Sequence, residues 1–134
     1  MIISDDKTKL DIVLIHNFLT TSYWAVGRKI EEVKKSIEHS ICFGVYEDGK
    51  QIGFARIVTD YTVIAYLMDV FILEEYRGKG FSKLLLKRIF EDERFKRVKK
   101  WMLATKDAHS LYAQFGFGGI KNPDRLMEKI VLRK

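Results

Sequence analysis

The sequence lacks the features that hold small secreted proteins together. Its 134 residues include one cysteine, Cys42, so no intramolecular disulfide can form. The first ten residues lack the basic stretch and long apolar run of a secretory signal. These absences predict a soluble protein in a reducing, cytoplasmic setting.

Long apolar runs and linkers are also missing. A membrane-spanning helix needs roughly 18 uninterrupted apolar residues, but the most apolar segment, Val63 to Leu73, contains Asp69. The only proline is Pro123, and no repeat or glycine- or serine-rich tract divides the chain. With 47% hydrophobic residues the chain is long enough to bury one core. We therefore expect a single domain over residues 1–134 and no membrane span.

Acidic residues are scarce in one segment. Residues 77–106 carry 11 basic and three acidic residues, a net charge of +8, whereas the rest carries 13 basic and 15 acidic residues, a net charge of −2. Such a field favours a polyanionic ligand, either a nucleotide cofactor or a nucleic acid. A solvated basic helix face explains the charge equally well. A nucleic-acid binder would show interleaved aromatics and a recognised motif, so we expect no nucleic-acid partner.

Apolar spacing predicts helices first and strands later. After a short strand at Met1–Ser4, two stripes at helical intervals predict two amphipathic helices: Leu10, Val13, Leu14 and Phe18, then Ile30, Val33 and Ile37. Further along, Ile41–Tyr46 and Gln51–Thr59 predict a hairpin around Asp48-Gly49, and Val63–Leu73 predicts a central strand covered on both faces. A short strand at Trp101–Ala104, a helix at Ala108–Phe115 ending at Gly116, and a final strand at Met127–Leu132 are predicted after them.

A glycine loop joins the central strand to the next helix. Backbone N–H groups at a helix start converge on anions, and glycine lets the backbone approach them closely. The segment Arg77-Gly78-Lys79-Gly80-Phe81-Ser82 suits a phosphate, but lacks the glycine patterns of nucleoside-triphosphate and dinucleotide sites. A plain strand-to-helix turn is the alternative.

Two motifs in this half of the chain resemble the GNAT superfamily of N-acetyltransferases. Residues 67–80 resemble its signature, in which the pyrophosphate loop reads Q/R-x-x-G-x-G/A, and Ala108 to Phe117 match A-x-x-L-Y-x-x-F-G-F. The resemblance covers residues 62–118. It implies an α/β (α+β) fold of three layers: a mixed, mostly antiparallel sheet of about six to seven strands, helices on both faces, and two central strands splayed apart.

The resemblance also assigns a cofactor site for acetyl-CoA. The backbone around Val70, Phe71 and Ile72 would hydrogen-bond the pantetheine arm like an added strand. Residues of the loop would hold the pyrophosphate: Arg77, Gly78, Lys79, Gly80, Phe81 and Ser82, the last standing where Gly or Ala is usual. The basic residues from Lys83 to Lys100 would face the 3′-phosphate, with part of them solvated. Thr105 stands where family members often carry a pantetheine-binding Asn.

Two residues are candidates for catalysis. By resemblance Tyr112 is the general acid that protonates the departing thiolate, and the alternative from its apolar stripe is a core tyrosine whose hydroxyl merely finds a partner. Asp69, the single charge of an apolar run, needs a partner or a raised pKa. It either is satisfied by neighbouring groups, or faces the acceptor, binding an ammonium or relaying its proton.

The residues that would bind the amine acceptor carry the weakest sequence signal. Ser22, Tyr23 and Trp24 lie in the connector that borders the acceptor site in this fold, although an exposed Tyr-Trp pair more often packs two helices together. His16, His39 and Cys42 show no ligand spacing, so no metal is expected.

These features predict an acyltransferase that moves an acetyl group from acetyl-CoA to a primary amine by direct attack in a ternary complex. The alternative is a non-catalytic acyl-CoA-binding or regulatory domain. The acceptor is a small-molecule or peptide amine, and a homodimer is left open because homodimers are common in similar folds.

Overall fold

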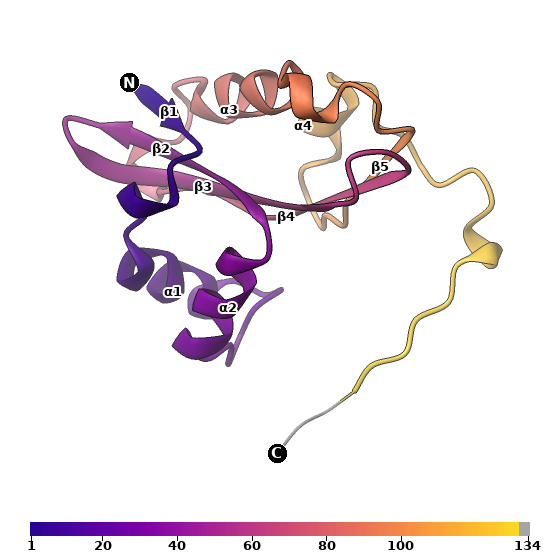
Figure 1. The fold of residues 1–134 in the computed structure, drawn as a ribbon, viewed down its shortest axis with the longest axis horizontal. Helices are drawn as coiled ribbons and strands as arrows, with labels where there is room; N and C mark the ends of the chain where they lie inside the picture. Colours follow the sequence, from indigo (N-terminus) through magenta and orange to yellow (C-terminus); the bar gives the residue numbers. More distant parts are fainter. Residues whose placement is uncertain (132–134) are drawn as a thin grey trace. The chain divides into compact units, whose positions relative to one another are not determined.

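The computed structural model describes residues 1–131, which form two compact units, Met1–Ala104 and the segment from Thr105 onward. The first unit is built on one sheet in the order β1-β2-β3-β4-β5 (Figure 1). The first four strands pair antiparallel and β5 pairs parallel with β4. The strands are β1 Ile2–Ser4, β2 Ile41–Glu47, β3 Lys50–Thr59, β4 Ile64–Ile72 and β5 Lys100–Met102.

This sheet confirms a mixed, mainly antiparallel α/β architecture and corrects its size. The described residues form five strands rather than six or seven. The predicted strand over Met127–Leu132 accounts for part of the difference, because residues 127–131 are irregular and Leu132 lies outside the described residues. An apolar run becomes a strand only when a sheet edge pairs with its backbone, and spacing alone does not show that edge.

The hairpin between β2 and β3 forms where the sequence predicts it. Glu47 pairs with Lys50, and the two residues between them have φ angles of 50° at Asp48 and 76° at Gly49. Positive φ at both turn positions is what a tight two-residue hairpin requires, and Asp-Gly supplies it at low cost.

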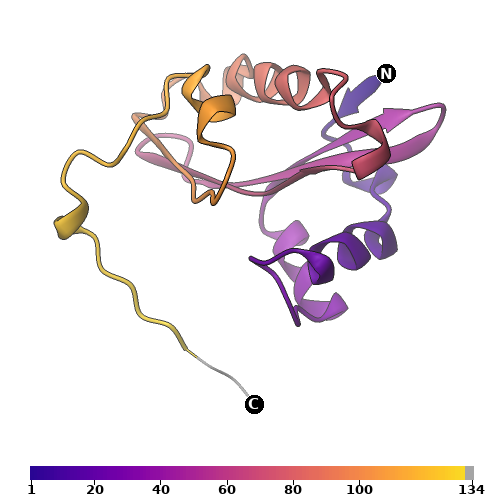
Figure 2. The same cartoon turned by 180° about the vertical axis from the view of Figure 1, so that it is seen from behind.

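Helices cover both faces of the sheet in the first unit. The helices α1 (Ile12–Thr21) and α2 (Ile30–Glu38) lie on one face, and α3 (Phe81–Phe90) lies on the other (Figures 1 and 2). The Asp11 side chain starts α1 by accepting a hydrogen bond from the Leu14 N–H at 3.0 Å. Short 3-10 turns occupy Lys7–Lys9, Glu74–Tyr76, Glu93–Phe95 and Pro123–Arg125.

The core beneath α1 and α2 differs in one respect from the predicted stripe. Ile15 and Leu19 are fully buried in it, whereas Val13 is 59% exposed. Since Ile12 to Ile15 are all apolar, periodicity alone does not select the inward face. The Phe18 ring stacks on Phe71 with centroids 4.0 Å apart and ties α1 to β4.

The central strand β4 lies between β3 and β5, so it is not an edge strand. Its residues alternate along the strand: Ala65, Leu67, Asp69 and Phe71 are buried, and the side chains between them are half-buried. The predicted cover is thus complete on one face and partial on the other.

The second unit contains one short helix, α4 (His109–Ala113). Its end is marked by Gly116, whose φ is 92° and whose N–H donates to the Ala113 carbonyl at 3.1 Å. In the described part of the chain no helix is both long and apolar enough to cross a membrane.

The core assignment predicts a sharp contrast between neighbouring positions of α1. Ile15→Ala removes a fully buried side chain and is expected to lower the free energy of unfolding by about 2–5 kcal/mol. Val13→Ala is expected to change it by less than about 0.5 kcal/mol. Urea denaturation followed by circular dichroism measures both, and equal effects would contradict the observed helix orientation.

Candidate active site

The segment between β4 and α3 is shaped by two glycines in the left-handed region. Gly78 has a φ of 77° and Gly80, the N-cap residue of α3, a φ of 85°. A Cβ added at either glycine would meet no atom within 4 Å. Glycine adopts this conformation without strain, and its missing side chain leaves open space beside the backbone.

The N–H groups that follow this bend form no hydrogen bond within residues 1–131. Arg77 N–H still donates to the Glu74 carbonyl, and Leu84 N–H donates to Gly80. Between them lie six donors without a partner in the described structure, those of Gly78, Lys79, Gly80, Phe81, Ser82 and Lys83. Unpaired N–H groups at a helix start, together with the positive end of its dipole, bind anions.

Two side chains of the loop carry positive charge, but they lie differently. Arg77 Nε donates to the carbonyl of Ile72 at 3.0 Å, so part of its guanidinium fixes the loop onto β4. Lys79 is exposed, with Nζ 5.5 Å from the centroid of the Tyr76 ring. Glu74 and Glu75 lie on the surface.

The basic cluster of α3 and the turn after it is partly neutralised. Arg88 and Arg94 both bind Asp92, at 2.8 and 2.9 Å. The Arg94 guanidinium, and then that of Arg88, hold the pKa of Asp92 well below its usual range. Lys83 is exposed and forms no ion pair with a described residue. Part of the predicted anion-binding charge is therefore structural.

Only the first part of β4 is paired with β5. The parallel ladder joins Ile64 to Lys100 and ends where Tyr66 pairs with Met102. From Leu67 to Ile72, β4 continues with β3 on one side and without β5 on the other. An extended ligand could add to this open edge as a further strand.

A bulge distorts β4 at the start of this open edge. The register with β3 shifts between Phe54 and Arg56, and Asp69 has a φ of 54°. A positive φ is uncommon for a residue with a side chain, although Asp tolerates it better than most. Strained backbone of this kind clusters at functional sites.

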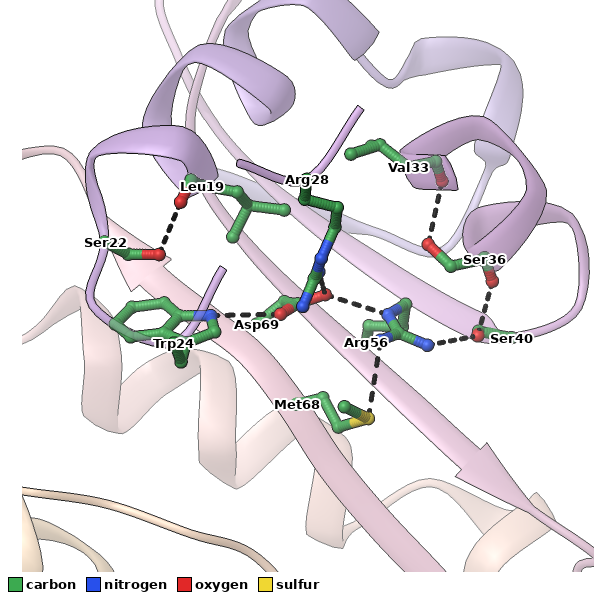
Figure 3. Close-up of polar contacts among 10 residues, drawn as sticks. All are labelled: Leu19, Ser22, Trp24, Arg28, Val33, Ser36, Ser40, Arg56, Met68 and Asp69. Atoms are coloured by element: carbon green, nitrogen blue, oxygen red, sulfur yellow. Dashed lines mark hydrogen bonds and ion pairs between the residues drawn. The ribbon is translucent and has the colours of Figure 1, made fainter. Parts of the chain in front are cut away.

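Asp69 lies at the centre of a buried polar network. Its Oδ2 accepts hydrogen bonds from Arg28 Nη1 at 2.8 Å and Arg56 Nε at 2.9 Å, and its Oδ1 accepts one from Trp24 Nε1 at 3.0 Å (Figure 3). Of the two readings of the sequence, this arrangement favours a carboxylate satisfied by its neighbours. The network joins the bulge of β4 to β3 and to the connector between α1 and α2.

Arg28 and Arg56 are the residues that the sequence reasoning missed. Arg56 is nearly buried in β3 and also donates to Ser40 Oγ and Met68 Sδ (Figure 3). A charged residue inside a run as apolar as Gln51–Thr59 is itself a signal, since it needs a counter-charge as much as Asp69 does. Arg28 lies in an irregular connector and gives no such signal.

The connector residues point in different directions. Ser22 is buried, and its hydroxyl donates to the Leu19 carbonyl at 2.6 Å, which closes the end of α1. Tyr23 and Trp24 are more exposed and pack edge to face, with centroids 5.2 Å apart. The structure therefore joins Trp24, through its indole N–H, to the bulge.

Cys42 is a core residue beside this network. Burial raises the pKa of its thiol to about 11, so the thiol stays protonated at neutral pH. Because the thiolate is the reactive form, Cys42 is a poor nucleophile.

Tyr112 and Thr105 belong to the second unit. Tyr112 lies on α4, is largely buried, and packs edge to face with Phe117 at 5.9 Å. The Thr105 hydroxyl accepts a hydrogen bond from the Ala108 N–H at 3.0 Å and so caps the turn before α4.

The sequence and the fold both match the GNAT acetyltransferase family. Residues 38–118 match the family model for the acetyltransferase (GNAT) domain. A GNAT-family protein from Xanthomonas campestris pv. campestris, known from a crystal structure, is 43% identical in sequence to this chain. The two structures superpose with a TM-score of 0.94 over 97% of this chain and 92% of that one. The chain belongs to the GNAT family and is an acyltransferase.

Two further relatives extend this comparison. The uncharacterized N-acetyltransferase ycf52 of Gracilaria tenuistipitata var. liui is 31% identical over 105 residues, which cover 74% of this chain and 57% of that protein. The structure of Rv2747 from Mycobacterium tuberculosis, solved in complex with CoA, has the same fold at a TM-score of 0.72 and 15% identity, covering 90% of this chain and 74% of that one.

The network predicts a large effect from a small change at Asp69. Asp69→Asn keeps the shape and the tolerance of positive φ, but it removes the charge that two guanidinium groups share. The free energy of unfolding is expected to fall by about 3–5 kcal/mol, as when one partner of a buried ion pair is removed. Chemical denaturation measures it, with exposed Glu75→Gln as the control, expected within about 0.5 kcal/mol of wild type. An Asp69→Asn variant whose free energy of unfolding equals that of the wild type would contradict the network.

Proposed function

We propose that the chain transfers an acetyl group from acetyl-CoA to a primary amine by direct attack, with both substrates bound together. The observation that carries the proposal is the row of N–H groups from Gly78 to Lys83, six donors that have no partner within residues 1–131 and that follow two glycines with positive φ. A pyrophosphate presents the charge and the acceptor oxygens that such a row binds.

The residues of the loop and of β4 fit the cofactor in this proposal. The amides of residues 78–83 bind the pyrophosphate, with added charge from Lys79 and from the part of Arg77 that Ile72 leaves unused. The open edge at Val70–Ile72 pairs with the pantetheine arm. In this proposal Thr105 donates its hydroxyl proton to the pantetheine arm. The proton is available because the hydroxyl oxygen only accepts the hydrogen bond from the Ala108 N–H.

Tyr112 supplies the proton for the leaving group. As the amine nitrogen forms the new C–N bond and the C–S bond breaks, Tyr112 donates its phenolic proton to the sulfur, and the amine proton passes to water. Positioned proton transfer of this kind typically contributes about 10²–10⁴-fold. The protonated thiol of Cys42 argues against an acyl-enzyme at this cysteine, because the thiolate is the reactive form.

Asp69 has a positioning role in this proposal. Both of its oxygens already accept hydrogen bonds, so it holds Trp24 and Arg28 at the bulge rather than relaying a proton. With Tyr23, these residues line the approach of the amine.

The pyrophosphate contact predicts a selective loss of cofactor affinity. Gly80→Ala places a methyl group in the open space beside the amides and strains a φ of 85°. We expect CoA to bind at least about tenfold more weakly, as the loss of one charge-assisted hydrogen bond would cause. Calorimetric titration with CoA and with pantetheine, which lacks the pyrophosphate, separates the effects, because only CoA binding should change.

The hairpin glycine gives a matched control. Gly49 also has a positive φ, 76°, and open space around its missing side chain. Gly49→Ala should therefore show the same kind of backbone strain without loss of CoA affinity. Equal weakening in the two variants, or weakened pantetheine binding in Gly80→Ala, would contradict the assigned contact.

The role of Tyr112 predicts a loss of rate without a loss of binding. Tyr112→Phe keeps the ring that packs on Phe117 and removes the acid, so kcat should fall by about 10²–10⁴-fold while the Kd for acetyl-CoA stays unchanged. A thiol-release assay with pooled amines measures the rate, with exposed Tyr61→Phe as the control. Tight acetyl-CoA binding without release for any amine, in the wild-type chain, would favour the non-catalytic acyl-CoA-binding alternative.

A further inference from the structure

The network around Asp69 holds more positive charge than negative. Two guanidinium groups, Arg28 and Arg56, share the single carboxylate of Asp69. Their side chains are only 20% and 9% exposed. A partly buried charge without a counter-charge is costly, so this place favours a ligand with one negative charge.

The two arginines differ in the number of hydrogen bonds that their guanidinium groups donate. Arg56 donates to three partners, Asp69, Ser40 and Met68. The Arg28 guanidinium donates from Nη1 to Asp69, and its remaining N–H groups have no partner among residues 1–131, whereas the backbone N–H of Arg28 donates to the Ala25 carbonyl. The planar guanidinium of Arg28 thus retains free donors, and it is the more exposed of the two.

The position of Arg28 connects these donors to the proposed reaction. The anion-binding loop follows the end of β4, and the open edge of β4 leads back from Ile72 to the bulge at Asp69. A cofactor whose pyrophosphate binds at the loop and whose pantetheine arm pairs with this edge extends toward the bulge. Arg28 and the 40% exposed ring of Trp24 meet there on one carboxylate.

We propose that the acetyl acceptor is an amine that also carries a carboxylate, as amino acids do, and that Arg28 binds this carboxylate. This inference rests on the proposed function and names the substrate class of the same site. A guanidinium matches a carboxylate with two parallel hydrogen bonds. The single excess charge of the network matches one carboxylate better than a phosphate, which carries nearly two charges.

A binding experiment tests the inference without any turnover. The protein saturated with CoA is titrated with N-acetylglycine, with its carboxamide and with the corresponding phosphonate. We expect the carboxylate to bind at least about tenfold more tightly than the amide. An amide that binds equally well, a phosphonate that binds more tightly, or no binding of the carboxylate would each overturn the inference.

Variants assign the preference to Arg28. In Arg28→Gln the ratio of carboxylate to amide affinity should fall to about one, and Arg28→Lys, which keeps the charge without the planar fork, should keep part of it. Arg94→Gln, which removes an arginine bound to Asp92 and Asp5, is the control and should keep the full ratio. An unchanged ratio in folded Arg28→Gln would show that another group binds the carboxylate and would overturn the assignment.

A competition assay separates this inference from the proposed function. Amino acids and their amides are offered together with acetyl-CoA, and the products are identified by mass spectrometry. Acetylation of both kinds to the same extent would overturn the carboxylate preference and leave amine acetylation standing. No acetylated amine, despite bound acetyl-CoA, would overturn the proposed function, and the binding experiment then decides the inference by itself.

Discussion

The buried carboxylate of Asp69 holds three segments of the first unit together. Asp69 is enclosed in the sheet, and it is tolerable there because Arg56 reaches it from β3 while Arg28 and Trp24 reach it from the connector between α1 and α2. The same contacts fix the bulge, which interrupts the ladder with β3 where β4 loses its other neighbour. A carboxylate in an apolar strand therefore links the sheet to the least regular segment of the first unit.

The loop after β4 follows a second constraint, which is the accounting of backbone hydrogen bonds. A helix always begins with N–H groups that its own carbonyls do not reach. In many proteins a Ser, Thr, Asp or Asn side chain satisfies one of them, whereas the N-cap residue of α3 is Gly80, which has no side chain to do so. The N–H groups at the start of α3 therefore stay available to a ligand, whereas a capping side chain would occupy one of them.

How much the sequence predicts depends on whether the cause is local. The Asp48-Gly49 turn and the glycines at 78 and 80 were predictable, because their positive φ angles follow from residue type. The inward face of α1 was not, because apolar residues surround its first turn, and the last strand was not, because pairing needs a partner edge. A partner for Asp69 was predictable from the cost of a buried charge, but Arg28, 41 residues away, was not.

The burial of Cys42 has a consequence for a reaction that releases a thiol. The only sulfhydryl of the chain is enclosed in the core and stays protonated, so it neither forms a mixed disulfide with the thiol product nor reacts with oxidised forms of it. A chromogenic thiol reagent would therefore report the product alone while the chain remains folded.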